Sequence, residues 1–157
     1  MASPTFDFQV DAMWQALPAL LQGAKLTLFI TLTGLAVGFV IGAFFGLAKT
    51  ARTRLVSKPA GVYVETVRGT PLMVQVMFLY FGLPLLLGTR IPPIIAGITA
   101  IGVNSGAYIA EVVRGAIQSI ERGQREAARS LGLTTRQTML YIVWPQAFKR
   151  MIPALGN

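Results

Sequence analysis

The sequence contains no cysteine, no histidine and only six acidic residues among 157. Without cysteine, disulfides and thiolate metal sites are excluded. Because histidine is missing as well, a soft-metal centre and a catalytic triad built on histidine are excluded too. The G-x-x-x-x-G-K-[ST] loop that cradles nucleotide phosphates is also absent. We therefore expect no catalytic residue, no metal and no cofactor in this chain.

Charge is scarce, and it is unevenly distributed. Charged residues make up 13% of the chain, about half of the share typical of a soluble domain, while apolar residues make up 54%. The mean hydropathy is +0.60. A net charge of +8 is compatible with nucleic-acid binding. However, the basic residues adjoin apolar runs, and the most basic stretch lacks the interleaved aromatic residues that stack on bases. The composition predicts an all-α membrane protein in contact with lipid and no nucleic-acid partner.

Residues 1–21 precede the first long apolar run and form the first predicted unit. They carry Asp7 and Asp11 and lack a basic start, so they do not form a cleavable signal peptide. Two interpretations remain open, namely a short amphipathic segment at the membrane interface or a partly ordered tail. The apolar residues behind the first interpretation are Phe8, Trp14, Leu17, Leu20 and Leu21.

Residues 22–157 form the second unit, and its first membrane span is predicted from Leu26 to Ala48. These residues carry no charge and reach about 35 Å as a helix, enough to cross a bilayer. Glycines recur every fourth position along this span, which predicts close packing of a second helix against a smooth face. They are Gly34, Gly38, Gly42 and Gly46.

The second span is predicted to be broken. A helical entry over 59–67 leads to Arg68-Gly69-Thr70-Pro71, after which the apolar pattern resumes from Leu72 to Leu87. Interrupted helices that carry a charge at the break are where transporters tend to place substrate contacts. Arg68 has an equally open alternative, in which it extends to the membrane surface beside a simple kink.

The third span runs from Ile94 to about Val113 and carries three polar residues on one face. Asn104, Tyr108 and Glu111 are spaced as neighbours on a helix and would be costly against lipid, so we expect them to face a partner or an aqueous path. In an open alternative, Glu111 simply pairs with Arg114.

The distribution of positive charge predicts the orientation. Eleven of the fourteen basic residues lie in 49–58 and 114–150, which places both segments in the cytoplasm and the N-terminus outside.

The second cytoplasmic segment predicts two short helices joined by a glycine. Ser119 is expected to cap the first helix, and Gly132 to end it with a left-handed residue. Thr134 and Gln137 read as a capping box that opens the second helix. Pro145 is expected to end or kink that helix.

This helix–glycine–helix pattern resembles the EAA signature of membrane subunits of ABC importers, with Trp144 where leucine is usual. The matching residues are Glu126, Ala127, Ala128, Gly132, Ile142 and Pro145. Two further strings, V-R-G-T-P-x-x-V-Q from Val67 and N-S-G-A-Y-x-x-E from Asn104, resemble the polar amino acid branch. The strings A-Y-I-A-E, Q-V-M-F and P-A-L-G-N are most similar to glutamine-type permeases.

The resemblance implies a type I ABC importer transmembrane domain in a bacterial inner membrane. It implies a coupling helix that docks on a cytoplasmic ABC ATPase, a second permease subunit and a periplasmic amino acid-binding protein. Family members continue through roughly two more helices, so we expect a C-terminally truncated chain with three complete spans and the start of a fourth. An ion-coupled secondary transporter is the alternative, but it would give the basic helix–glycine–helix loop no purpose.

A zwitterionic substrate at membrane depth needs a donor for its carboxylate and an acceptor for its ammonium group. We hypothesise that six residues surround the transported amino acid, although Arg68 and Glu111 have framework roles as their alternative. The six are Arg68, Thr70, Gln75, Asn104, Tyr108 and Glu111.

Overall fold

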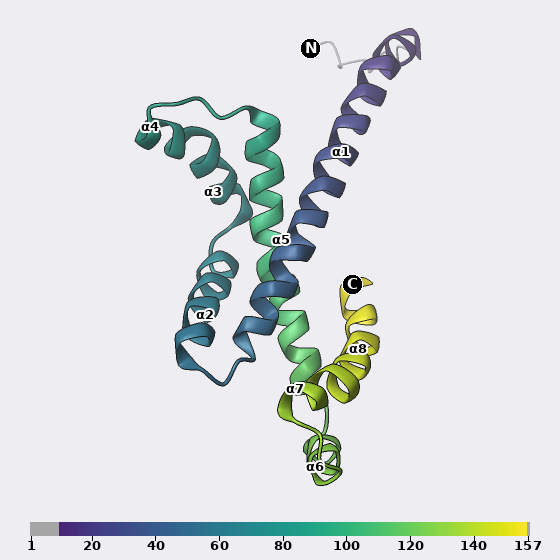
Figure 1. Ribbon diagram of the computed structural model, residues 1–157. Helices are drawn as coiled ribbons and strands as arrows, with labels where there is room; N and C mark the ends of the chain where they lie inside the picture. The colour runs from purple at the N-terminus through teal and green to yellow at the C-terminus, as the bar shows by residue number, and fades with distance from the viewer. Residues whose placement is uncertain (1–9, 157) are drawn as a thin grey trace, which may run out of the picture.

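The computed structural model describes residues 10–156, and over that range the protein is helical throughout with no strand (Figure 1). The predicted all-α class is therefore confirmed. The α-helices are α1 (Val10–Lys49), α2 (Arg54–Arg68), α3 (Leu72–Met77), α4 (Leu83–Leu87), α5 (Pro93–Gln118), α6 (Arg122–Ser130), α7 (Thr135–Gln137) and α8 (Trp144–Gly156). Two π-helical turns, η1 (Phe78–Gly82) and η2 (Thr138–Val143), join α3 to α4 and α7 to α8.

Helix α1 is longer than the predicted first span. It begins at Val10 and continues without a break to Lys49, about 60 Å of helix against the ~30 Å of a bilayer's hydrocarbon core. The expected interfacial segment therefore has no structural boundary with the span over 10–49, and Trp14 in its first turns is exposed. Asp7 and Phe8 lie outside the described residues.

Helices α1 and α5 pack closely along the predicted glycine stripe, and Figure 1 shows them crossing at the centre of the molecule. A Cβ added at Gly42 would stand 2.5 Å from Ile109 Cβ, and one added at Gly46 would stand 2.6 Å from Val113 Cβ. The stripe is thus the contact surface of α1, and its side chains could not be larger without separating the two helices.

The predicted break in the second span is a sharp bend. The axes of Arg54–Arg68 and Leu72–Leu87 differ by 101°. Two helices, Met13–Lys49 and Pro93–Gln118, are long and apolar enough to cross a membrane, and the bent pair provides a third crossing if it is one span. Helix α5 extends five residues beyond the expected end at Val113.

The C-terminal part folds back onto α5. Ile117, Val143 and Met151 lie in an apolar cluster where α5, η2 and α8 meet, and each is at most 4% exposed. Of the two alternatives expected for Pro145, the end of the helix is wrong, because α8 starts at Trp144 and runs on to Gly156. Pro145 occupies the first turn of α8, where a missing N–H is tolerated, and the wider turn η2 joins it to α7.

The connections gather at two ends of the molecule. In Figure 1 the α1–α2 loop and α6 lie at the lower end, whereas the α4–α5 connection and the start of α1 lie at the upper end. The two segments rich in basic residues thus share one end, as their predicted common location requires.

Candidate substrate path and coupling surface

Arg68 and Tyr108 come together from separate elements. Arg68 is the last residue of α2, and its guanidinium carbon lies 5.1 Å from the ring centroid of Tyr108 on α5. This distance is within the range of a cation–π contact. Asn104 lies one turn before Tyr108 and is half-buried. The structure therefore brings three of the six predicted substrate-path residues into one region.

Gln75 closes the bend between α2 and α3. Its Nε2 donates to Val67 O and to Thr70 O, each at 2.9 Å, and Val67 O also accepts from Thr70 N at 3.3 Å, so the side chain ties together the carbonyls at the interruption of the helix. Thr70 in turn donates its hydroxyl to Thr66 O at 2.8 Å.

The bond pattern of Gln75 also leaves one polar atom available. Because both donors of the amide point at carbonyls, Oε1 is an acceptor, and it is buried without a hydrogen-bond partner among the described residues. Gln75 also lines a cavity of about 330 Å³, together with Phe78 and Val103. Gln75 therefore has a framework role through its nitrogen and an unpaired acceptor on a side chain that lines a cavity.

Glu111 lies in an ion network that joins three helices. Its carboxylate accepts from Lys49 Nζ at 3.1 Å and from the Arg114 guanidinium, and Lys49 also lies 3.8 Å from Glu65 on α2. The alternative pairing of Glu111 with Arg114 is thus observed. Lys49 was expected only as part of a basic loop, and nothing local in the sequence indicates a partner 62 residues away.

Helix α6 ends in a six-to-one hydrogen-bonded cap. Leu133 N donates to Ala128 O at 3.1 Å, and Gly132, with φ +84°, reverses the chain between them. A residue without a Cβ is favoured at this left-handed position, as predicted. The capping box of Thr134 and Gln137 is present as well.

The expected capping role of Ser119 is wrong. Ser119 follows the end of α5, its hydroxyl donates to Ala116 O at 2.8 Å, and α6 begins three residues later behind Glu121. The side chain returns to its own helix because the chain has not yet turned into α6 at that point.

The segment formed by α6 and the cap through Leu133, hereafter the coupling knob, has an exposed side and an attached side. Glu126 and Ala127 are exposed, and Leu131 at the tip is 81% exposed. On the attached side Ala128 is 4% exposed and Arg125 donates to Ile117 O of α5 at 2.6 Å. The remaining signature residues follow the knob in the chain, with Ile142 in η2 and Pro145 in α8.

A second arginine, Arg150 of α8, donates to Ser119 O at 2.6 Å. Together with Arg125 it satisfies carbonyls at the C-terminal end of α5, where guanidinium groups also complement the helix dipole. The sequence reasoning missed both arginines as structural residues. Their only signal was the excess of positive charge in 122–150, where six basic residues stand against the single acidic residue Glu126.

Comparison with known proteins identifies the family. Residues 34–157 match the family described as binding-protein-dependent transport system inner membrane component. The chain is 48% identical over 151 residues to the glutamine transport system permease protein GlnP of Escherichia coli (strain K12), covering 96% of this chain and 69% of that protein. It is 39% identical over 141 residues to the arginine transport system permease protein ArtQ of Bacillus subtilis (strain 168), covering 90% and 64%.

Solved structures agree with the sequence relatives. A crystal structure of an amino acid ABC transporter with histidines superposes with a TM-score of 0.87 at 40% identity and covers 98% of this chain and 70% of that one. The MetNI methionine ABC transporter superposes with a TM-score of 0.72 at 24% identity, which shows the fold, over 89% and 68%. In this family ATP hydrolysis belongs to a partner ATPase. The chain therefore belongs to the family of binding-protein-dependent transport system inner membrane components, as an amino acid ABC transporter permease and not as an enzyme.

Proposed function

We propose that this chain lines the pathway of an importer for polar amino acids, with glutamine as the substrate, and that a cytoplasmic ATPase drives it through the coupling knob. The 48% identity to a glutamine permease supports the choice of glutamine. Because the chain is also 39% identical to an arginine permease, a cationic amino acid should be tested beside glutamine.

The observation that carries the coupling role is the two-sided construction of the knob. Its outer side offers Glu126 and the 81% exposed Leu131, a charged and an apolar contact for a groove. Its inner side is tied to α5 by the bond from Arg125 to Ile117 O. A force applied at Leu131 would therefore be transmitted to α5 through a charge-assisted hydrogen bond as well as through the chain.

Helix α5 in turn would carry that displacement to the rest of the permease. It packs along α1 through the glycine stripe, and it is joined to α1 by the ion pair of Glu111 with Lys49. Closure of the ATPases on nucleotide would favour one arrangement of these helices over another, which is a shift between inward-open and outward-open populations.

The proposed orientation places the coupling knob and the α1–α2 loop in the cytoplasm and the N-terminus outside. The positive-inside rule supports it, as does the position of both basic segments at one end of the molecule (Figure 1). A second permease chain, identical or related, and a periplasmic amino acid-binding protein complete the proposed assembly.

The proposed substrate contacts lie around the bend in the second span. Arg68 would meet the carboxylate of the amino acid, while Oε1 of Gln75 would accept from its ammonium group. Tyr108 and Asn104 would contact the remainder from α5. Glu111 is already compensated by Lys49 and Arg114, so we assign it to the framework.

The experiment that tests the substrate is ATP hydrolysis by the complete complex in vesicles, with the binding protein loaded in turn with glutamine, arginine and leucine. Stimulation by glutamine above the other two is expected. Alanine at Asn104 should raise the glutamine concentration needed for transport while the complex assembles normally. Unchanged concentration dependence would place the site elsewhere.

The coupling role is tested at Gly132. Gly132→Val puts a β-branched residue at φ +84° and should strain the cap by roughly 1–2 kcal/mol, so the ATPase should co-purify poorly and transport should fall. Gly132→Asn is the matched control, because asparagine tolerates a left-handed backbone. Normal transport by the valine variant would refute the coupling role. Transport that persists with a catalytically dead ATPase would favour an ion-coupled secondary transporter.

A further inference from the structure

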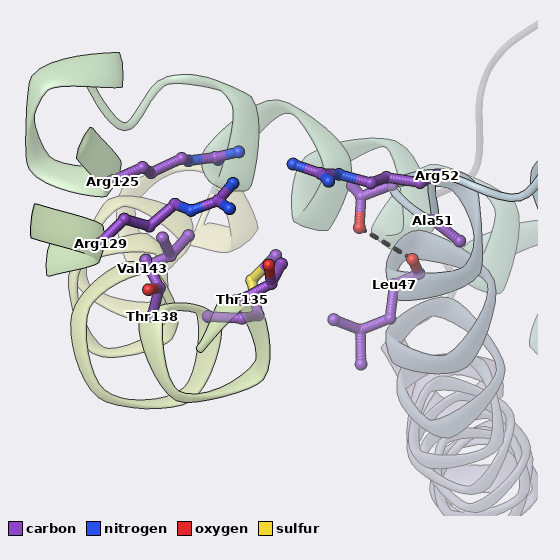
Figure 2. A pocket seen from close by; sticks show the side chains of 10 residues that line it. Leu47, Ala51, Arg52, Arg125, Arg129, Thr135, Thr138 and Val143 are labelled. Atoms are coloured by element: carbon purple, nitrogen blue, oxygen red, sulfur yellow. Dashed lines mark hydrogen bonds between the residues drawn. The ribbon is translucent and has the colours of Figure 1, made fainter. Parts of the chain in front are cut away.

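A cavity of about 410 Å³ lies between the C-terminal end of α1 and the base of the coupling knob. Figure 2 shows arginine side chains reaching it from two sides, with Arg52 from the loop after α1 and Arg125 and Arg129 from α6. Leu47 and Met139 contribute an apolar wall. The volume lies within the range of small-molecule sites, which runs from about 300 to 1,000 Å³.

The cavity contains unsatisfied polar groups as well as unpaired charge. Thr138 is 4% exposed, lines the cavity, and has no hydrogen-bond partner for its hydroxyl within residues 10–156. Arg125 uses its terminal nitrogen on Ile117 O, but its Nε is buried and unpaired over the same range. Within that part of the chain, no ion pair involves Arg52, Arg125 or Arg129. Buried polar groups normally have partners, so the Thr138 hydroxyl and Arg125 Nε indicate an occupant that accepts hydrogen bonds. The guanidinium groups of Arg52 and Arg129, which are exposed and also line the cavity, favour an occupant that carries negative charge.

The chemistry of the lining favours a phosphate diester. Guanidinium groups bind phosphate oxygens through paired N–H donors, and a threonine hydroxyl adds one more. The apolar wall continues along α1, where Phe44 is 67% exposed one turn before Leu47, so an acyl chain leaving the cavity would meet apolar surface. Basic pockets between helices at the cytoplasmic side of a membrane protein suit anionic lipid head groups.

We propose that this cavity binds the phosphate group of an anionic phospholipid from the cytoplasmic leaflet. The bound phosphate joins Arg52, on the α1 side, to Arg125 and Arg129 on the coupling knob. No side-chain hydrogen bond or ion pair in the described residues joins those two sides directly. The lipid would therefore steady the knob against α1 and tune its coupling to the ATPase, a consequence that depends on the proposed function.

The binding test uses the complete permease–ATPase complex in phosphatidylcholine nanodiscs with spin-labelled phosphatidylglycerol, and spin-labelled phosphatidylcholine as the reference lipid. Arg52→Gln is compared with Arg54→Gln, which removes the same charge two positions further on, at the first residue of α2, without lining the cavity. Arg129→Gln is compared with Arg136→Gln of α7 in the same way. Both variants of a pair lose the same general attraction to an anionic surface. A difference in phosphatidylglycerol affinity between them therefore measures binding in the cavity. Each cavity variant should bind phosphatidylglycerol about tenfold more weakly than its control.

A second variant separates binding from folding. Thr138→Val keeps the shape of the side chain and removes the unpaired hydroxyl, so the complex should be at least as heat-stable in phosphatidylcholine while it loses phosphatidylglycerol affinity.

Equal affinities within both arginine pairs would overturn the proposal. Displacement of the labelled lipid by millimolar inorganic phosphate would overturn the lipid assignment in favour of a free anion site. Loss of ATPase co-purification at unchanged lipid affinity would show that the cavity receives an acidic side chain of the ATPase instead. Binding as predicted without any effect on lipid-dependent ATP hydrolysis would refute only the coupling consequence.

Discussion

Replacing Gly42 with alanine should separate α1 from α5 and lower the stability of the permease. The added Cβ would stand 2.5 Å from Ile109 Cβ and 2.9 Å from the backbone oxygen of Gly106, and ordinary contact begins at 3.4 Å. The helices must therefore move apart locally by about 0.9 Å, a gap that forfeits a quarter to a half of the dispersion attraction across the affected contacts. Overpacking of this kind costs about 1–3 kcal/mol.

The assay is the thermal unfolding midpoint of the purified permease in detergent, with Gly23→Ala as the control. Gly23 lies on the same helix and a Cβ there meets nothing within 4 Å, so alanine should keep or raise the midpoint through its better helix propensity. Because apolar burial does not drive helix association within a membrane, the packing loss at Gly42 has little to offset it. Equal midpoints for the two variants would show that α1 and α5 adapt freely and would refute the close-packed seam.

Three further predictions follow from the site and the topology. Single cysteines at Thr53 and Thr89 should react with an impermeant reagent from opposite sides of the membrane, with Thr89 outside; reaction of both in intact cells would contradict the orientation. Glu111→Gln should leave Arg114 without a counter-charge and Lys49 with only the more distant Glu65. It should therefore lower the free energy of unfolding by roughly 1–3 kcal/mol, measured by denaturant or heat, with glutamine-dependent transport changed only in proportion to the protein that folds. Tyr108→Phe keeps the ring beside the Arg68 guanidinium and should preserve substrate affinity, whereas Tyr108→Ala should weaken it. An equal loss of affinity in both variants would indicate that the hydroxyl group matters and not the ring.

The membrane spans and the glycine stripe were predictable from the sequence because each depends on the residues of one helix alone. An uncharged run of sufficient length predicts a span, and four glycines at intervals of four predict a smooth face, whatever the partner is. Gly132 and the capping box of Thr134 and Gln137 were equally predictable, since each involves groups within a few residues of one another.

Features that depend on distant partners were not predictable. Ser119 has the right residue type for a cap, but its hydroxyl already bonds to Ala116 O and accepts from Arg150, which lies 31 residues further on. Pro145 has the right type to end a helix, but a π-helical turn before it lets the helix continue. Likewise, the partner of Lys49 became visible only when α1 and α5 were placed side by side.

The arginine bonds at the end of α5 also bear on how the protein is made. Carbonyls at that end remain open until Arg125, and then Arg150, have left the ribosome. Chains grow at about 5–20 residues per second, so roughly 2–6 s pass between the synthesis of Ser119 and that of its guanidinium partner 31 residues later. During that interval the end of α5 depends on water for its hydrogen bonds. A nascent chain that stalls before Arg150 would therefore present a frayed helix end to cellular quality control, at the membrane surface where proteases and chaperones reach it.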